Sequence, residues 1–512
     1  MKAPHPVVML GLDAAELELV RRWSAQGALP TIRRLIDGGT FGPLAGPAAR
    51  FAGGVWPTFY TARDVAWHGL YHNKLWRQER MRCEIADAGW IAEPPFWERL
   101  ADTGLRLAVL DVPMTVATPK AMHGVSLAGW GTHDVIARGS WPAGLWAELS
   151  RTHGAPRMPA ELFGGRSART LERLTEDLVA ATEQMGRIGA VLLSRERWDL
   201  FLLVFGALHR GGHYLWDLTQ IDTGGLDESG RLALEGALLR VYRAADDALA
   251  VVLARAPADA RVLLFAVHGM GPNTAWADRC EDILACIQRG GAAPPPKRGM
   301  LYSVKRRLSW PLVRAFTTRL PTPVQGRLVS LWSGSMFDWR TTRAFPLPTD
   351  QAGYVRINLR GREPGGLVEP GADYAALAEE IAAGLEGFRD LATGRPTVRQ
   401  VHRLDDLAPP GAPARDRLPD LVVEWDHVSP VESPGISSPR YGELRWDPVG
   451  RLPSGRAGNH RPQGWFVAAG PGIGAGRWAV QRDIRDLVPT VWRWLGAGAH
   501  DAFQGTPIPE IA

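Results

Sequence analysis

The stretch Val-Val-Met-Leu-Gly-Leu-Asp, residues 7–13, decides the fold class. It is an uncharged run that stops at a carboxylate, Asp13, as expected of a strand that is buried on both faces and followed by a turn. Similar runs occupy residues 105–111, 200–205, 262–267, 421–425 and 465–469, and helical patterns lie between the runs at 15–26, 29–37, 168–193 and 231–254. This alternation predicts an α/β fold with a mostly parallel central sheet and helices on both faces.

The composition excludes several classes of protein. Of the 512 residues, 45% are hydrophobic and 22% are charged, which excludes a mainly disordered chain. The net charge of +5 is too small to indicate a nucleic-acid partner. Three cysteines without a C-x-x-C motif argue against a disulfide framework. No uncharged run approaches the ~18 residues of a membrane span, and the first apolar run is too short for a signal peptide. We therefore expect a cytoplasmic protein.

Residues 290–350 interrupt the alternation and predict an insertion between two parts of the core, 1–289 and 351–512. The insertion begins with a Gly/Ala/Pro linker at 290–296, and basic residues then alternate with apolar ones over 297–320. Two interpretations remain open. The segment is either a solvated cap over the core or a patch that contacts a membrane surface or an acidic partner.

Four polar islands follow predicted strands, where ligands bind in open α/β sheets. Asp13 ends the first run, and His209 and His213 follow the 200–205 run in the order H-R-G-G-H. His268 follows the 262–267 run, and His460 lies in G-N-H-R-P. Two histidines four residues apart share one side of a helix, which is a ligand spacing for a transition metal. For any one histidine taken alone, a hydrogen-bonded structural role is favoured, and local sequence cannot show that distant islands converge.

The order and spacing of the motifs resemble the alkaline phosphatase superfamily, in its type I phosphodiesterase / nucleotide pyrophosphatase branch. The matching stretches span nearly the whole chain: 7–13, 29–35, 56–61, 68–69, 198–201, 209–213, 268–271, 353–364, 460–464 and 486–490. The resemblance implies a three-layer α/β/α sandwich with a mostly parallel central sheet and a cap or insertion. It also implies a metal-dependent hydrolase of a phosphate ester, a phosphodiester or a related anionic ester.

Carried over by position, the resemblance implies two metal positions. His209, His213 and His460 would form the first, a three-histidine site that leaves a coordination position open for water. Asp13 and His268 would belong to the second. Zinc is the expected ion, one or two per chain, with iron or manganese as alternatives.

Two departures from the family pattern leave the chemistry open. The carboxylate position before His268 is Val267, and the nucleophile position, nine residues before Thr61, is Ala52. Either Thr58 or Thr61 replaces the nucleophile, or a metal-bound hydroxide attacks directly. The third alternative is a protein that no longer hydrolyses phosphate esters. It would then catalyse a lyase, isomerase or oxidative step, or only bind its ligand.

Further residues are candidates for contact with a small anionic substrate. His133 follows a predicted strand and either lines the pocket or is an ordinary turn histidine. Asn273 lies in the His268 loop and is a candidate donor to a substrate oxygen. Four polar residues stand two apart on a predicted strand and would share one face, which either holds an anion or is solvated: Arg356, Asn358, Arg360 and Arg362. The three arginines among them are the candidates for binding substrate. The sequence does not determine an oligomeric state.

Overall fold

The computed structural model describes residues 4–117, 122–132, 136–159, 167–220, 227–291, 337–448, 450, 452, 454–498 and 501–511. The expected basic segment at 297–320 and His133 lie outside these described residues. Within the described ranges, no helix combines the length and the apolar character needed to cross a bilayer.

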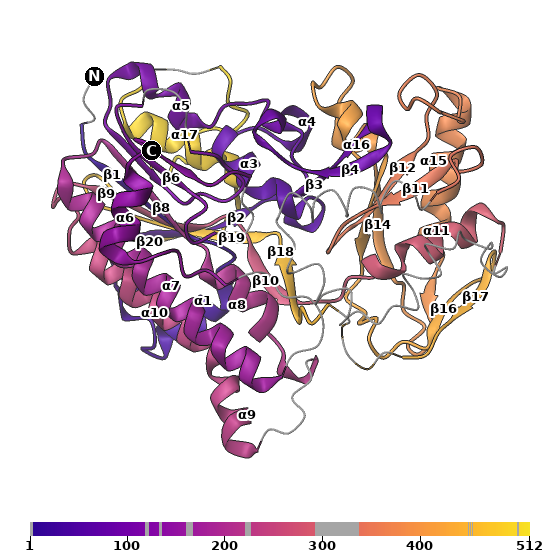
Figure 1. Cartoon of the computed structure of the whole chain (residues 1–512), viewed down its shortest axis with the longest axis horizontal. Helices are drawn as coiled ribbons and strands as arrows, with labels where there is room; N and C mark the ends of the chain where they lie inside the picture. Colours follow the sequence, from indigo (N-terminus) through magenta and orange to yellow (C-terminus); the bar gives the residue numbers. More distant parts are fainter. Residues whose placement is uncertain are drawn as a thin grey trace.

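A ten-stranded, mostly parallel sheet forms the centre of the larger part of the molecule (Figure 1). Its strands run in the order β20-β2-β19-β9-β1-β8-β5-β6-β7, with β21 paired to β2. Their bounds are β1 Val7–Leu12, β2 Thr40–Ala45, β5 Leu107–Leu110, β6 Gly124–Ala128, β7 Gly139–Trp141, β8 Leu200–Phe205, β9 Arg261–Ala266, β19 Gln463–Ala469, β20 Gly476–Arg477 and β21 Arg482–Asp483. The predicted fold class is confirmed.

Strand β1 shows why an unbroken apolar run belongs at the centre of this sheet. Val8, Leu10 and Leu12 enter one hydrophobic core, whereas Val7 and Met9 enter another on the opposite face. Because successive side chains point to opposite faces, a strand covered on both sides needs apolar residues at every position. The first core contains α1 Leu17–Ala25, α2 Pro30–Gly38, α6 Leu145–His153, α7 Ala168–Arg195, α8 Ala207–Leu215 and α10 Ala237–Leu253. The second contains α3 Val55–Thr61, α5 Phe96–Arg99 and α17 Leu487–Trp494.

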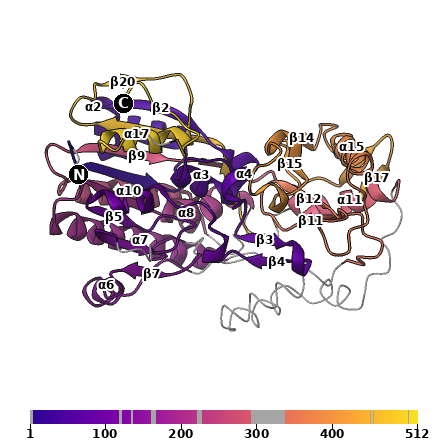
Figure 2. The same ribbon diagram turned by 90° about the horizontal axis from the view of Figure 1, so that it is seen from above.

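A smaller unit lies beside the central sheet (Figure 2). Its antiparallel sheet runs in the order β11-β12-β15-β14, with the bounds β11 Ala344–Leu347, β12 Gly353–Ile357, β15 Leu421–Trp425 and β14 Val398–Arg403. Helices α11 Cys280–Gln288 and α15 Ala372–Glu386 cover it within a third hydrophobic core. The sheet of β13 Arg389–Asp390, β16 Gly435–Ser438 and β17 Gly442–Arg445 completes the unit. Residues 351–512 are thus shared between this unit and the central sheet.

Two of the strands that the sequence analysis expected to be parallel are antiparallel to their neighbours. The 421–425 run is β15 of the smaller sheet, and the 465–469 run lies in β19, which is antiparallel to both β2 and β9. An apolar run specifies burial but not direction, so the sequence could not distinguish these strands from β1 or β8.

A short ribbon next to the carboxyl end of β9 and the start of β19 completes the surroundings of the site. It consists of β10 Gly269–Pro272 and β18 Gly458–Arg461, which pair antiparallel with Met270 opposite His460. The remaining elements are α4 Val65–His68, α9 Glu228–Glu235, α16 Leu404–Leu407 and the hairpin of β3 Lys74–Arg77 and β4 Arg82–Ile85.

Candidate metal centre and active site

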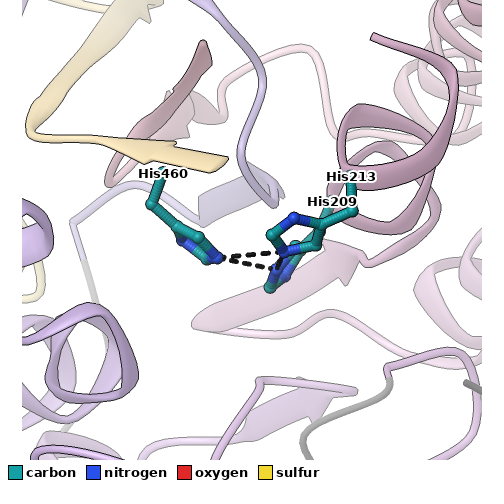
Figure 3. A group of neighbouring side chains, drawn as sticks. All are labelled: His209, His213 and His460. Atoms are coloured by element: carbon teal, nitrogen blue, oxygen red, sulfur yellow. Dashed lines mark hydrogen bonds between the residues drawn. The ribbon is translucent and has the colours of Figure 1, made fainter. Parts of the chain in front are cut away.

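Three histidines from two elements converge at the carboxyl ends of the central strands (Figure 3). Helix α8 follows β8 directly and carries His209 and His213 one turn apart, whereas His460 comes from β18. The Nε2 atom of His209 lies 2.8 Å from that of His213 and 3.1 Å from that of His460. The Nε2 atoms of His213 and His460 are 3.1 Å apart. All three residues are buried.

A close backbone approach brings the ribbon to α8. A Cβ atom on Gly458 would lie 2.1 Å from the carbonyl oxygen of Gly212, so no larger residue fits there without a shift. The same glycine orients a ligand, because the Nδ1 atom of His213 donates to the Gly458 carbonyl over 2.8 Å. Glycine at position 458 therefore fixes both the distance between the two elements and the tautomer of His213.

The carboxylate of Asp13 orients the second imidazole of α8. Its Oδ2 atom accepts a hydrogen bond from His209 Nδ1 over 2.9 Å, and its Oδ1 atom accepts one from Trp56 Nε1 over 2.8 Å. The Nε2 atom of His268 lies 3.3 Å from the same Oδ1 atom. Burial alone would raise the pKa of Asp13, but His209 and His268 hold it well below its ordinary value. Asp13 is therefore a carboxylate that binds and orients imidazoles.

The donor set fits a zinc ion. The acceptors of His209 and His213 take the Nδ1 protons, which leaves both Nε2 atoms as lone-pair donors. The pKa of His213 lies well below its ordinary value, mainly because the ring is buried and also because Arg456 and the neighbouring imidazoles lie close to it. Burial and neighbouring charges lower the pKa of His460 in the same way. Neutral imidazoles are the form that binds metal. A tetrahedral ion with Zn–N bonds of about 2.0–2.1 Å needs nitrogens about 3.3 Å apart, close to the observed spacing.

Among the residues that the structure describes, there is no matching second set of ligands. Asp13 and His268 lie together as expected, but Val267 is fully buried in the hydrophobic core that contains α3 and α17. Ala52 lines the pocket beside Asp13 and offers no donor atom. Within the described ranges, His209, His213 and His460 are the one group of three His, Cys, Asp or Glu side chains that converges closely enough for a metal.

The chain matches a known protein family over most of its length. The model of the family described as type I phosphodiesterase / nucleotide pyrophosphatase matches residues 7–432. The chain belongs to this family. The expected resemblance is thus confirmed, and with it an enzyme of the phosphoester hydrolase class.

Solved structures are similar to this chain at low sequence identity. The phosphonoacetate hydrolase of Sinorhizobium meliloti 1021, in complex with phosphonoformate, is 15% identical, with a TM-score of 0.50 over 97% of this chain and 96% of that chain. Human ectonucleotide pyrophosphatase / phosphodiesterase 5 is 12% identical, with a TM-score of 0.48 over 98% and 97% of the two chains. No curated protein matches this chain.

The two threonines considered as replacements for the family's nucleophile have hydroxyls engaged elsewhere. Thr61 Oγ1 donates to the carbonyl of Pro57 over 2.6 Å, within α3. Thr58 Oγ1 lies 3.1 Å from Nε2 of His68, whose Nδ1 accepts from the backbone N–H of Leu70. The neutral ring of His68 therefore carries its proton on Nε2 and donates to Thr58, so it does not act as the base that would activate this hydroxyl.

The arginines predicted to bind substrate lie in the smaller unit. Strand β12 ends at Ile357, so the expectation of one strand face shared by Arg356, Arg360 and Arg362 is wrong. Arg356 is fully buried against Glu363 at 2.8 Å, and Arg362 holds both oxygens of Asp420 at 2.8 and 2.7 Å. Arg360 is exposed and pairs with Glu369. None of these arginines lines the pocket at the histidines.

Asn273 also holds a loop rather than facing the pocket. Its Nδ2 atom donates to the carbonyl of Arg456 over 2.9 Å, and its Oδ1 atom accepts from the backbone of Ala275 and from Asn459.

The pocket contains residues that the sequence analysis missed. Arg456, Asp350, His72 and Asn73 all line it together with Asp13 and His460. Arg456 stands four residues before His460, and this proximity to a predicted island was the one signal available in the sequence. Asp350, His72 and Asn73 come from loops whose position depends on the smaller unit, and no local pattern marks them.

Proposed function

We propose that this protein is a metal-dependent hydrolase of phosphodiester or pyrophosphate bonds, with one zinc ion held by His209, His213 and His460. The observation that carries the proposal is the convergence of three buried Nε2 atoms, two of which have their Nδ1 protons fixed by Asp13 and Gly458. A divalent ion bound there supplies a Lewis acid that polarises a phosphoryl oxygen and lowers the pKa of water.

The residues around the triad define how the reaction would proceed. Ala52 has no hydroxyl, and the hydroxyls of Thr58 and Thr61 are engaged within their own layer of the fold. Water is therefore the proposed nucleophile, and no phosphorylated residue forms. Asp13 keeps the His209 ring in place through Nδ1, and Trp56 in turn fixes Asp13. A histidine ligand depends on such outer partners for its orientation.

The test compares hydrolysis of three substrates by zinc-loaded protein: bis(4-nitrophenyl) phosphate, 4-nitrophenyl phosphate and 4-nitrophenyl sulfate. We expect the phosphodiester to be hydrolysed fastest, with loss of both bound zinc and turnover in His213→Ala. His402→Gln is the matched control, because His402 is paired with Glu424 in the smaller sheet. Zinc retained at full occupancy by His213→Ala would contradict the proposed ligand set.

A non-hydrolytic metalloenzyme is the second candidate. Ala52 and Val267 favour it, because they remove the nucleophile and a metal-ligating carboxylate at the positions where the family resemblance places them. Full zinc occupancy without turnover of any of the three esters would favour this candidate over the hydrolase.

A further inference from the structure

A phosphoryl group in this site needs more positive charge than the three-histidine position provides alone. The family resemblance implies two metal positions, but the second retains only Asp13 and His268 here, since Val267 and Ala52 cannot ligate. Charge that develops on the phosphoryl oxygens is usually offset by cations or donors fixed in advance. The inference that follows rests on the proposed function and names the residue that supplies this charge.

Arg456 is placed for that task. It precedes β18, and its side chain is only 10% exposed. Its Nη2 atom lies 2.6 Å from Nε2 of His213, so the guanidinium is at the triad itself. Among the described residues that line the pocket, it is the one arginine or lysine.

Asp350 holds this arginine from the other side. Nη1 of Arg456 donates to Oδ2 of Asp350 over 3.0 Å, so the two terminal nitrogens span the distance between the carboxylate and the triad. A guanidinium is planar and permanently charged, and its fork of N–H groups matches the oxygens of a phosphate. The ion pair with Asp350 therefore fixes the orientation of the fork.

The contact with His213 indicates what Arg456 binds. Nε2 of His213 cannot accept a hydrogen bond while it ligates a metal ion. The Nη2 group of Arg456 that now donates to it then points to the place where an acceptor bound beside the ion would lie. A phosphoryl oxygen of a substrate bound beside the triad is such an acceptor.

We propose that Arg456 binds a phosphoryl oxygen of the phosphodiester and, held by Asp350, supplies the positive charge that the second metal position of this chain lacks. Arg456 is accordingly a substrate-binding residue, and Asp350 is a positioning residue that acts through it.

The test measures the affinity of zinc-loaded protein for inorganic phosphate by calorimetry, beside its zinc content. We expect Arg456→Gln to weaken phosphate binding about 10- to 100-fold, as loss of a charge-assisted pair would, while one zinc ion per chain is retained. Arg456→Lys restores the charge without the fork and should fall in between. Asp350→Asn should weaken binding less than Arg456→Gln. Arg399→Gln, which removes an exposed arginine paired with Glu424 in the smaller unit, is the control and should bind phosphate like the wild type.

Phosphate affinity separates this inference from the proposed function. If zinc-loaded wild type binds phosphate but hydrolyses no ester, the proposed function fails while the role of Arg456 is still measured. Equal phosphate affinity in the wild type and in a folded Arg456→Gln variant overturns the inference. So does loss of zinc in both Arg456 variants, because Arg456 would then serve the triad and not the substrate. Absence of phosphate binding by the wild type overturns it as well.

Discussion

Replacing Asp13 by alanine should weaken zinc binding without changing the number of zinc ions per chain. The substitution removes the acceptor that lies 2.9 Å from His209 Nδ1 and leaves a buried N–H group without its partner. Loss of a hydrogen bond to a charged group costs about 1.5–3 kcal/mol. The lost hydrogen bond is the one that holds the His209 ring in the orientation that ligates zinc. The dissociation constant for zinc should therefore rise about 10- to 150-fold. Outer partners of metal-bound histidines have effects of this size, about 10- to 100-fold.

Competition with a chromophoric chelator measures the dissociation constant, and elemental analysis of the same samples gives the stoichiometry. Asp13→Asn keeps an acceptor without the charge and should lose less affinity than Asp13→Ala. Trp56→Phe removes only the donor to Oδ1 and should lose the least of the three. Two zinc ions in the wild type and one in Asp13→Ala would refute the reasoning, because Asp13 would then ligate a second ion.

Three further predictions concern buried residues in and around the site and in the smaller unit. Burial lowers the pKa of His68 to about 3, so the unfolded chain binds the extra proton first and stability falls as the pH drops below about 6.5. His68 alone should remove about 2 kcal/mol of the free energy of unfolding between pH 7.5 and pH 5, and denaturant titrations of His68→Gln should lack this part of the slope. Gly458→Ala should lose zinc in elemental analysis, because its Cβ would meet the Gly212 carbonyl at 2.1 Å, whereas Gly474→Ala, with open space around it, should retain zinc. Arg356→Met should lower the free energy of unfolding by about 1.5–3 kcal/mol, because it removes a charge-assisted hydrogen bond to the buried Glu363, which then relies on Arg362 as its cation, and an unchanged denaturation midpoint would show that the ion pair contributes nothing.

The part of the fold that follows from the sequence is the part that local patterns encode. The apolar run of β1 and the H-R-G-G-H spacing of His209 and His213 depend on neighbours along the chain, and both expectations are met in the structure. The convergence of His460 with them spans 251 residues from His209 and depends on the ribbon and on Gly458. No local pattern reports such a contact, and only the family resemblance pointed to it.

The arginines show where a local pattern misleads. The alternation from Arg356 to Arg362 predicted one shared strand face, but the strand ends at Ile357, and two of the guanidinium groups pair with Glu363 and Asp420 in the interior. Asp420 lies 58 residues from Arg362, so the sequence offered no sign of the pairing. The opposite error concerns Arg456: no local pattern marked it as a site residue, because only the folded chain places it beside His213.

Titration of metal-free protein with zinc, with the rate of phosphodiester hydrolysis followed at each addition, tests the central claim most directly. We expect the rate to rise linearly and to reach its plateau at one equivalent per chain, which is the result that one three-histidine position for the ion requires. A plateau at two equivalents, or full activity in protein that elemental analysis shows to be free of metal, would contradict this claim.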